Sequence, residues 1–252
     1  MSTLQKMTGH QYLNGSKYDK AILAVGSCEN HGFHLPFGTD TFVSSMLAEK
    51  VAAEVPDLLV LPPINVGVSE HYAHFPFTLT LRYETLIAVL KDIMTSVIKN
   101  GIKKIFIMNG HDGNIAPIEV AARSIKMEYP EAKIVSLDAW WVTAGKLLPA
   151  NTFEVWDGLG HAGEGETSIG LALFPELIEM EHARGVVPNL PDSVDIKWNF
   201  AELTDCGATG DPTKATQEKG KLMEEVLVKA VVTFFKDMEE CNWKYNSPQS
   251  AL

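Results

Sequence analysis

The sequence predicts a single α/β domain, spanning residues 1–252, with a mostly parallel sheet flanked by helices. Three observations support this class: four short runs rich in valine, isoleucine and leucine, longer amphipathic stretches between them, and the absence of a linker. Nearly continuous apolar runs are typical of strands that are buried on both faces. Strands alternating with helices build parallel sheets, because each helix returns the chain to the same starting edge.

The expected strands are residues 20–26, 58–61, 103–108 and 133–137. The helices expected between them are residues 41–54, 82–99 and 115–128. Asp40 or Thr41 could cap the first of these helices, because short polar side chains accept bonds from free helical N–H groups. Asn100 and Gly101 are expected to end the second helix.

The second half of the chain is expected to contain two more helices, residues 164–174 and residues 213–239. Between them, residues 183–212 contain several prolines and glycines, among them Pro188, Pro191 and Gly207. These residue types interrupt regular structure, so this segment is expected to be an irregular excursion that forms a small hairpin or a lid.

The composition excludes some classes of partner. A formal net charge of -11 argues against binding to nucleic acid or to an anionic membrane surface. No apolar run reaches the roughly 18 residues of a membrane span, and the N-terminus lacks the apolar region of a signal peptide. Three scattered cysteines do not form a disulfide framework. A cytoplasmic location is therefore expected.

Polar clusters follow two of the expected strands. Glu29, His31 and Asp40 come after the first strand, and His111 comes after the third. Alternate side chains of an extended segment point to the same side, so Glu29 and His31 are expected to converge. The carboxyl ends of parallel strands share one sheet edge, which is where ligands bind in such folds. Carboxylates combined with imidazoles favour Zn²⁺, Mn²⁺ or Fe²⁺ over Ca²⁺.

A third cluster, His161 to Ser168, lies at the start of the next expected helix and contains Glu164 and Glu166. With these residues, enough ligands are present for two divalent ions, and Asp40 could bridge them around a shared hydroxide. His161 fits a proton shuttle, because imidazole has a pKa near neutrality. A structural histidine and helix-stabilising glutamates are the alternative interpretations.

Three segments together carry a resemblance to a known family: residues 26–36, residues 109–114 and residues 161–168. In this order, and with Gly210-Asp211-Pro212 further along, they resemble the motifs of the creatininase (creatinine amidohydrolase) family. The resemblance implies a single α/β domain, usually assembled as a homohexamer. It also implies hydrolysis of C–N bonds in cyclic or formyl amides at a dinuclear centre of Zn²⁺, Mn²⁺ or Fe²⁺.

The resemblance also implies roles for individual residues. Glu29, Asp40 and His111 would hold one metal ion, His31 and the bridging Asp40 would hold the other, and His161 would be the proton-shuttling histidine. Creatininase has a glutamate ligand two residues after the histidine of the second motif, where this chain has Gly113. Glu166 is the expected replacement for this ligand, and Glu164 is the second candidate.

Other residues could line a substrate pocket. His34 lies between expected ligands, His71 follows the second strand, and Trp141 follows the fourth. Glu164 belongs with this group if it is not a ligand. An indole could cover a flat substrate ring. The alternative interpretations are a solvated loop for His34, a loop packed onto the core for His71, and core packing for Trp141.

The function expected from these observations is that of a metal-dependent amidohydrolase. It would use two divalent ions, zinc first among them, to cleave a C–N bond of a small cyclic or formyl amide through a metal-bound hydroxide. Two alternatives stay open. One is hydrolysis of another carbonyl compound, such as the C–C bond of a cyclic ketone, and the other is a metal-binding protein without turnover. No nucleic acid or membrane partner is expected, and the chain is expected to form a homo-oligomer.

Overall fold

The computed structural model describes residues 3–189 and 196–244, which form one α/β domain around a four-stranded parallel sheet. The strands are β1 (Lys20–Val25), β2 (Leu58–Val60), β3 (Lys104–Asn109) and β4 (Lys133–Leu137). Their order across the sheet is β2-β1-β3-β4, so β1 and β3 are central. These two strands pair along their full lengths, with Lys20 opposite Lys104 and Val25 opposite Asn109. Their carboxyl ends are therefore level.

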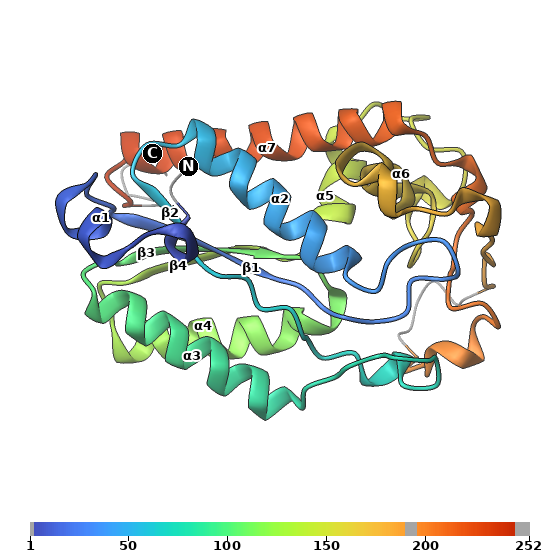
Figure 1. Ribbon diagram of the computed structural model, residues 1–252, viewed down its shortest axis with the longest axis horizontal. Helices are drawn as coiled ribbons and strands as arrows, with labels where there is room; N and C mark the ends of the chain where they lie inside the picture. Colours follow the sequence, from blue (N-terminus) through green and yellow to red (C-terminus); the bar gives the residue numbers. More distant parts are fainter. Residues whose placement is uncertain (1–2, 190–195, 245–252) are drawn as a thin grey trace, which may run out of the picture.

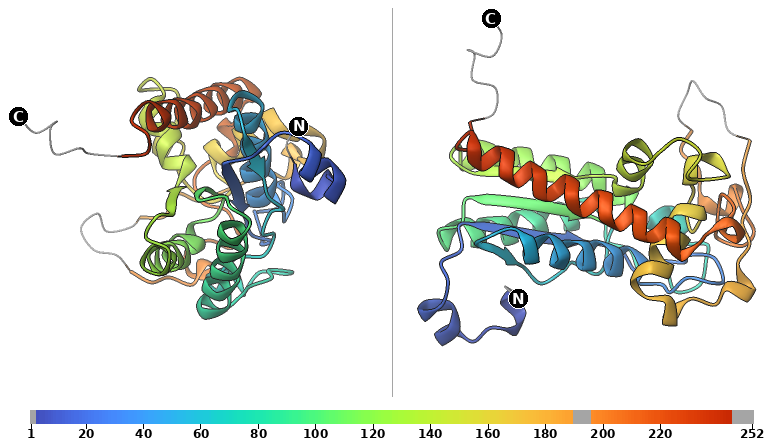
Figure 2. Two further views of the ribbon diagram at one scale, coloured as in Figure 1. Left: turned by 90° about the vertical axis from the view of Figure 1, so that its left-hand side faces the viewer. Right: turned by 90° about the horizontal axis from the view of Figure 1, so that it is seen from above.

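Helices cover both faces of the sheet, which gives three layers (Figures 1 and 2). One face packs against α2 (Thr39–Glu54), α5 (Trp140–Leu147), α6 (Glu164–Leu173) and α7 (Gln217–Glu240). The other face packs against α3 (Tyr83–Lys99) and α4 (Ile115–Glu128). The short α1 (Gly9–Asn14) lies beyond the β2 edge, where Thr3 forms a bridge with Val60.

The alternation of side chains along the central strands separates the two cores. Ile22 and Phe106 point into the core formed with α2 and α7, whereas Leu23 and Ile107 point into the core formed with α3 and α4. Both faces of β1 are therefore apolar, and all six of its residues are buried. This double burial explains why the strand is a continuous apolar run in the sequence.

The connections create a switch point between β1 and β3. From β1 the chain passes through α2 to β2 on one side, and it then crosses through α3 to β3 on the other side of β1. The two crossover helices lie on opposite faces of the sheet, so a crevice opens beyond the carboxyl ends of these two strands. The chain segments that follow β1 and β3 border this crevice.

The expected architecture is confirmed, and each expected strand lies within a residue of its observed bounds. Some details were wrong. The N-cap of α2 is Gly38, so Asp40 and Thr41 lie inside the first helical turn and do not cap it. The long C-terminal helix begins at Gln217 because Thr216 caps it.

Two helices, α1 and α5, were not anticipated, because both are short. The expected hairpin within residues 183–212 is not found in the described part of that segment. Val186 there makes a single bridge with Thr209. Residues 190–195 of the segment lie outside the described residues. None of the helices in residues 3–189 and 196–244 is both long and apolar enough to span a bilayer.

The packing of α6 against α7 depends on a glycine. A Cβ atom at Gly220 would overlap the carbonyl oxygen of Ser168, so only glycine permits this close approach of the two helices. At Gly145 in α5, by contrast, a Cβ atom would meet no atom closer than Asp157 O at 3.7 Å. The two helical glycines therefore differ in the space around them.

We expect Gly220→Ala to destabilise the protein by about 1–3 kcal/mol, because backbone must shift to admit the methyl group. Gly145→Ala is the matched control, and it should be neutral or raise the melting temperature, because alanine favours helix over glycine. Calorimetric or circular-dichroism melting of both variants measures the difference. Equal melting temperatures for the two variants would show that the α6–α7 contact adapts freely.

Candidate metal centre

A cluster of buried charged side chains occupies the crevice beyond β1 and β3. Glu29, His31, Asp40, His111, His161 and Glu166 converge there from four segments of the chain. Glu29 and His31 lie on the loop after β1, which is closed by a bond from the Glu29 N–H to Phe37 O of 3.0 Å. The structure thus brings together three carboxylates and three imidazoles that are separated by up to 137 residues in sequence.

Glu29, Asp40 and His111 form the first group of converging ligand atoms. His111 Nδ1 lies 3.1 Å from Glu29 Oε1 and 3.3 Å from Asp40 Oδ2. Both of these buried carboxylate oxygens lack a hydrogen-bond partner of acceptable geometry. Buried acceptors that go unsatisfied are rare in native proteins, and a missing ion is one explanation for them.

His31, Asp40 and Glu166 form the second group. His31 Nε2 lies 3.0 Å from Asp40 Oδ1 and 3.9 Å from Glu166 Oε2. The N–H of Ala162 donates to Glu166 Oε2 at 2.6 Å, which holds this carboxylate toward the cluster. Asp40 thus presents one oxygen to each group, which is the arrangement expected of a bridging ligand.

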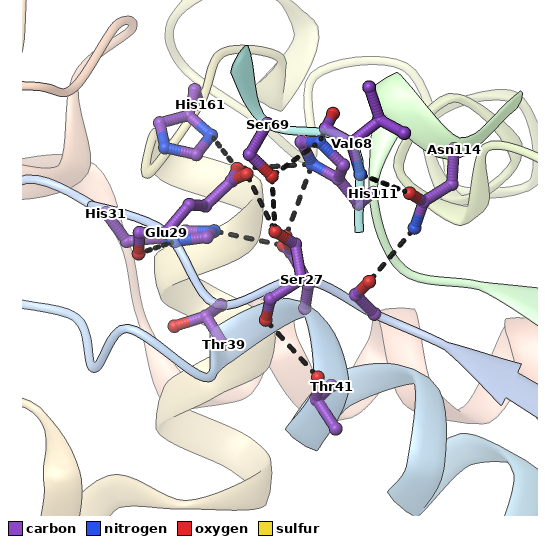
Figure 3. Close-up of polar contacts among 12 residues, drawn as sticks. Ser27, Glu29, His31, Thr39, Thr41, Val68, Ser69, His111, Asn114 and His161 are labelled. Atoms are coloured by element: carbon purple, nitrogen blue, oxygen red, sulfur yellow. Dashed lines mark hydrogen bonds and ion pairs between the residues drawn. The ribbon is translucent and has the colours of Figure 1, made fainter. Parts of the chain in front are cut away.

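Main-chain carbonyls set the orientation of the histidines (Figure 3). His111 Nε2 lies 2.9 Å from Val68 O, and His31 Nδ1 lies 3.2 Å from Glu29 O. A carbonyl accepts only, so these ring nitrogens carry the hydrogens. In the neutral rings, the opposite nitrogens direct lone pairs at the carboxylates. Lone pairs that face carboxylates require a cation between them, and this pattern is typical of metal-ligating histidines.

A second layer of polar side chains fixes these carbonyls and carboxylates. The Asn114 side chain accepts from Val68 N at 3.0 Å and donates to Gly26 O at 3.0 Å, which holds the Val68 carbonyl against His111 (Figure 3). Ser27 Oγ donates to Glu29 Oε2 at 3.0 Å and lies 2.5 Å from Ser69 Oγ. The orientation of the candidate ligands is therefore built into the fold.

The electrostatics of the cluster favour a cation. Burial alone would lower the pKa of His31, but Asp40, together with Glu166 and Glu29, outweighs burial and raises this pKa to about 9. Burial likewise opposes ionisation of Asp40, yet His31 and His111 hold its pKa below its ordinary value. Burial raises the pKa of Glu166 to about 7, with His31 opposing and Asp40 adding to the rise. Without a metal the carboxylates attract protons to the imidazoles, and divalent ions would supply the same positive charge.

His161 lies beside the two groups and differs from the other histidines. Its Nε2 donates to Asn30 O at 2.6 Å, and its Nδ1 lies 3.8 Å from Glu29 Oε1. Burial, with a contribution from His31, lowers the pKa of His161 to about 3, so the ring is neutral with its Nδ1 lone pair facing the cluster. His161 also belongs to a third converging group with Glu29 and His31. The near-neutral pKa expected of His161 is therefore not found, because the ring is buried; the neutral imidazole could still accept a proton or bind a metal.

Gly113 stands where the family resemblance implies a glutamate ligand. A Cβ atom at Gly113 would overlap Val68 O and lie 2.7 Å from His111 Nε2. Any side chain here would disturb the bond that orients His111. The backbone thus excludes a carboxylate at this position, and Glu166 is the third carboxylate that the fold brings into the cluster.

Glu164 does not reach the cluster. Its carboxylate accepts from the backbone N–H groups of Glu154 and Val155 at 2.9–3.1 Å and from Lys219 Nζ at 2.6 Å. The segment that it anchors leads directly to His161 and contains two non-glycine residues with positive φ, Trp156 and Asp157, and a third, Ala162, follows His161. Such conformations cost about 1–3 kcal/mol each unless the surroundings hold them. Glu164 therefore supports the segment that positions His161.

A cavity of about 280 Å³ opens beside the cluster, with Asp40, His111, His161 and Glu166 in its wall. Trp141 also lines this cavity, as the sequence suggested. His71 is not among the described residues that line this cavity, and its ring lies 5.8 Å from that of His111. His34 is buried away from the cavity, and its Nε2 lies 2.9 Å from Thr167 Oγ1.

Sequence reasoning missed part of the site. Tyr72 and Phe200 line the cavity with ring centroids 4.3 Å apart, and Tyr72 also lies 4.3 Å from the ring of His161. Ser27 and Ser69 support Glu29 and His111. Ser27 could have been found from its place between a strand end and a ligand. Phe200 lies in an irregular segment and carried no signal in the sequence.

Comparisons with known proteins agree with this geometry. The sequence model of the creatinine amidohydrolase family matches residues 5–235. The chain is 27% identical to creatinine amidohydrolase of Pseudomonas putida over 232 residues, covering 86% of this chain and 88% of that protein. It is 28% identical to the mycofactocin precursor peptide peptidase of Mycobacterium ulcerans, covering 82% of this chain and 80% of that protein. It is 29% identical to the 3-dehydro-scyllo-inosose hydrolase of Thermotoga maritima, covering 88% of this chain and 78% of that protein.

Solved structures give the same result for the fold. A Bacteroides fragilis protein named for creatinine amidohydrolase superposes with a TM-score of 0.82 at 27% identity, covering 94% of this chain and 95% of that one. A manganese form of creatininase superposes with a TM-score of 0.78 at 26% identity, covering 94% and 98%. A creatininase variant with a Zn-Zn centre is also similar, with a TM-score of 0.77 at 26% identity, covering 94% and 97%.

We expect about two divalent ions per chain after gentle purification with zinc or manganese, because two ligand groups share Asp40. Asp40→Ala should lose both ions, since it removes an oxygen from each group. Glu166→Gln should lose one ion and keep the other at Glu29, Asp40 and His111. Elemental analysis by mass spectrometry measures the stoichiometry.

Glu128→Gln, an exposed change at the end of α4, serves as the control for these variants and should keep the wild-type metal content. Retention of both ions by Asp40→Ala would contradict the bridging role. Two ions in Glu166→Gln would contradict its role as a ligand. Wild-type protein that binds no metal after supplementation would contradict the centre as a whole.

Proposed function

We propose that this chain, which belongs to the creatininase (creatinine amidohydrolase) family, hydrolyses a small cyclic or formyl amide with the help of two divalent metal ions. The family and the solved relatives place it among metal-dependent hydrolases. The number of ions, their identity and the amide substrate belong to the proposal. Zinc is the first choice, because histidine and carboxylate ligands suit it, and manganese or iron would fit the same donors.

The observation that carries the proposal is the shared position of Asp40. One buried carboxylate faces a histidine and a second carboxylate on each of its two sides. A single-metal site would not need two such groups. Two ions held there would polarise a carbonyl and lower the pKa of water, which is the chemistry that amide hydrolysis requires.

His161 is proposed to move the proton during the reaction. Its Nε2–H is held by Asn30 O, so the ring cannot rotate freely, and its neutral Nδ1 faces the cluster. A base at this place can take a proton from the attacking water and return it to the leaving nitrogen. Tyr72 packs against the ring at 4.3 Å and is buried, so it helps to keep bulk water from the histidine.

The cavity supports a small substrate. A space of about 280 Å³ lies at the small end of ligand pockets, which suits a compact ring or a formyl group better than a folded polypeptide. The relatives are named for different substrates, creatinine, a precursor peptide and an inosose among them. Hydrolysis of another carbonyl compound, such as a cyclic ketone, is therefore the second proposal for the same site.

A metal-binding protein without turnover would have less need of His161. A ligand set that only stores a metal gains nothing from a neutral imidazole oriented beside it. For assembly we propose a homo-oligomer, hexameric by family resemblance, and for location the cytoplasm.

His161→Ala should keep the metal content and lower turnover by about 10²–10⁴-fold, the usual contribution of a positioned general acid or base. Metal analysis and steady-state kinetics on the same preparation separate the two effects. Loss of a metal ion together with activity would instead make His161 a ligand. Unchanged turnover would assign the ring a structural role.

A panel of lactams, cyclic imides, N-formyl amines, creatinine and a cyclic ketone tests the reaction itself, with hydrolysis followed by mass spectrometry against a chelated control. We expect metal-dependent hydrolysis of an amide in this panel. Creatinine should react slowly or not at all, because Gly113 changes the ligand set that creatininase uses. Rapid creatinine turnover would contradict the predicted difference in substrate, and turnover of the ketone alone would favour the second proposal.

A further inference from the structure

Apart from the candidate metal ligands, the cavity beside the cluster is lined by one acidic residue and by no basic residue among those described. Residues that line it include Asp112, Phe200, Tyr72 and Trp141, and among the described residues the lining contains neither lysine nor arginine. Asp112 directly follows the ligand His111, and its side chain is exposed to solvent. Within the described part of the chain, residues 3–189 and 196–244, the Asp112 carboxylate makes no ion pair or side-chain hydrogen bond.

An anionic substrate would find no counter-ion in this wall. Phosphate and carboxylate groups are recognised by arginine or lysine side chains, and neither type lines the cavity in the described residues. The ions at the bottom of the site would engage the reacting carbonyl, so they would not serve a second anionic group at a distance. A substrate with a phosphate or sulfonate tail is therefore disfavoured.

A cationic group would find two complementary features. Asp112 supplies an exposed carboxylate beside the cavity. Phe200 and Trp141, which are both half-buried, supply partly exposed aromatic rings on the same cavity. Carboxylates and aromatic faces together are the groups with which proteins bind ammonium and guanidinium ions.

We propose that Asp112 and the adjoining aromatic wall select an amide substrate that carries a positively charged nitrogen group. This inference rests on the proposed function for the site of hydrolysis. It adds the charge of the substrate and the residue that recognises this charge. The amide carbonyl would point toward the ligand cluster. The cationic end would lie toward Asp112 and Phe200.

Three matched probes test the proposal: N-formyl-ethylenediamine, N-formyl-ethanolamine and N-formyl-taurine. They share one formyl amide and a two-carbon chain, and they end in an ammonium, a hydroxyl and a sulfonate group. Sulfonate is a weak metal ligand, so its affinity reports charge and not coordination. Binding to the metal-loaded full-length protein is measured by ligand-observed NMR, and hydrolysis is followed in parallel.

We expect the wild-type protein to bind the ammonium probe at least about tenfold more tightly than the sulfonate probe, with the hydroxyl probe between them. Asp112→Asn should bring this ratio close to one, and Asp112→Lys should reverse it. Metal content, measured on each variant, should stay at the wild-type value. The exposed change Glu128→Gln should keep the wild-type ratio, because it removes a similar charge far from the cavity.

Equal affinities in the wild-type protein, tighter binding of the sulfonate probe, or an unchanged ratio in Asp112→Asn would overturn the proposal. Failure of the two proposals can be told apart. Hydrolysis without charge discrimination leaves the proposed function standing and removes the role of Asp112. Charge discrimination that depends on Asp112, without hydrolysis of any amide, keeps the recognition and removes the proposed reaction.

Discussion

The buried carboxylate of Asp40, held between His31 and His111, is the interaction on which the rest of the site depends. Its two oxygens face different histidines at 3.0 and 3.3 Å, and the side chain is almost completely buried. A buried negative charge is costly unless positive groups surround it. The first turn of α2 adds its free N–H groups, which also favour a carboxylate there. Every other candidate ligand is arranged around this charge.

The topology of the sheet explains why the charge can be accommodated. β1 and β3 end level with each other, and α2 leaves the sheet on the face opposite α3. The loops after both strands therefore meet in the crevice beyond the strand ends, and neither of the two crossover helices fills this space. Gly110 permits this meeting, because a Cβ atom there would overlap Asp40 O. The fold thus supplies close approach between segments that the sequence keeps apart.

The same constraints shape the access to the site. The buried Glu164 pairs with the half-buried Lys219 and anchors the strained segment before His161. This segment and the turns carrying Tyr72 and Phe200 enclose a small cavity with an acidic rim. Rigid placement of His161 and restricted access are both useful to a hydrolase, since they orient the proton transfer and limit competing water. The position of Glu164 thus links helix packing to the chemistry of the site.

The sequence by itself determined the α/β class, the four strands and the residue types of a metal site. Apolar periodicity and polar residues after strand ends are local signals, and Glu29, His31, Asp40 and His111 all carried them. Only the tertiary structure decided which glutamate of residues 164–166 faces the cluster. Both lie in the first turn of α6, and a difference of two helical positions turns one toward Asp40 and the other toward Lys219. Phe200 and the exclusion of a side chain at Gly113 likewise depend on contacts between distant segments, which no local pattern records.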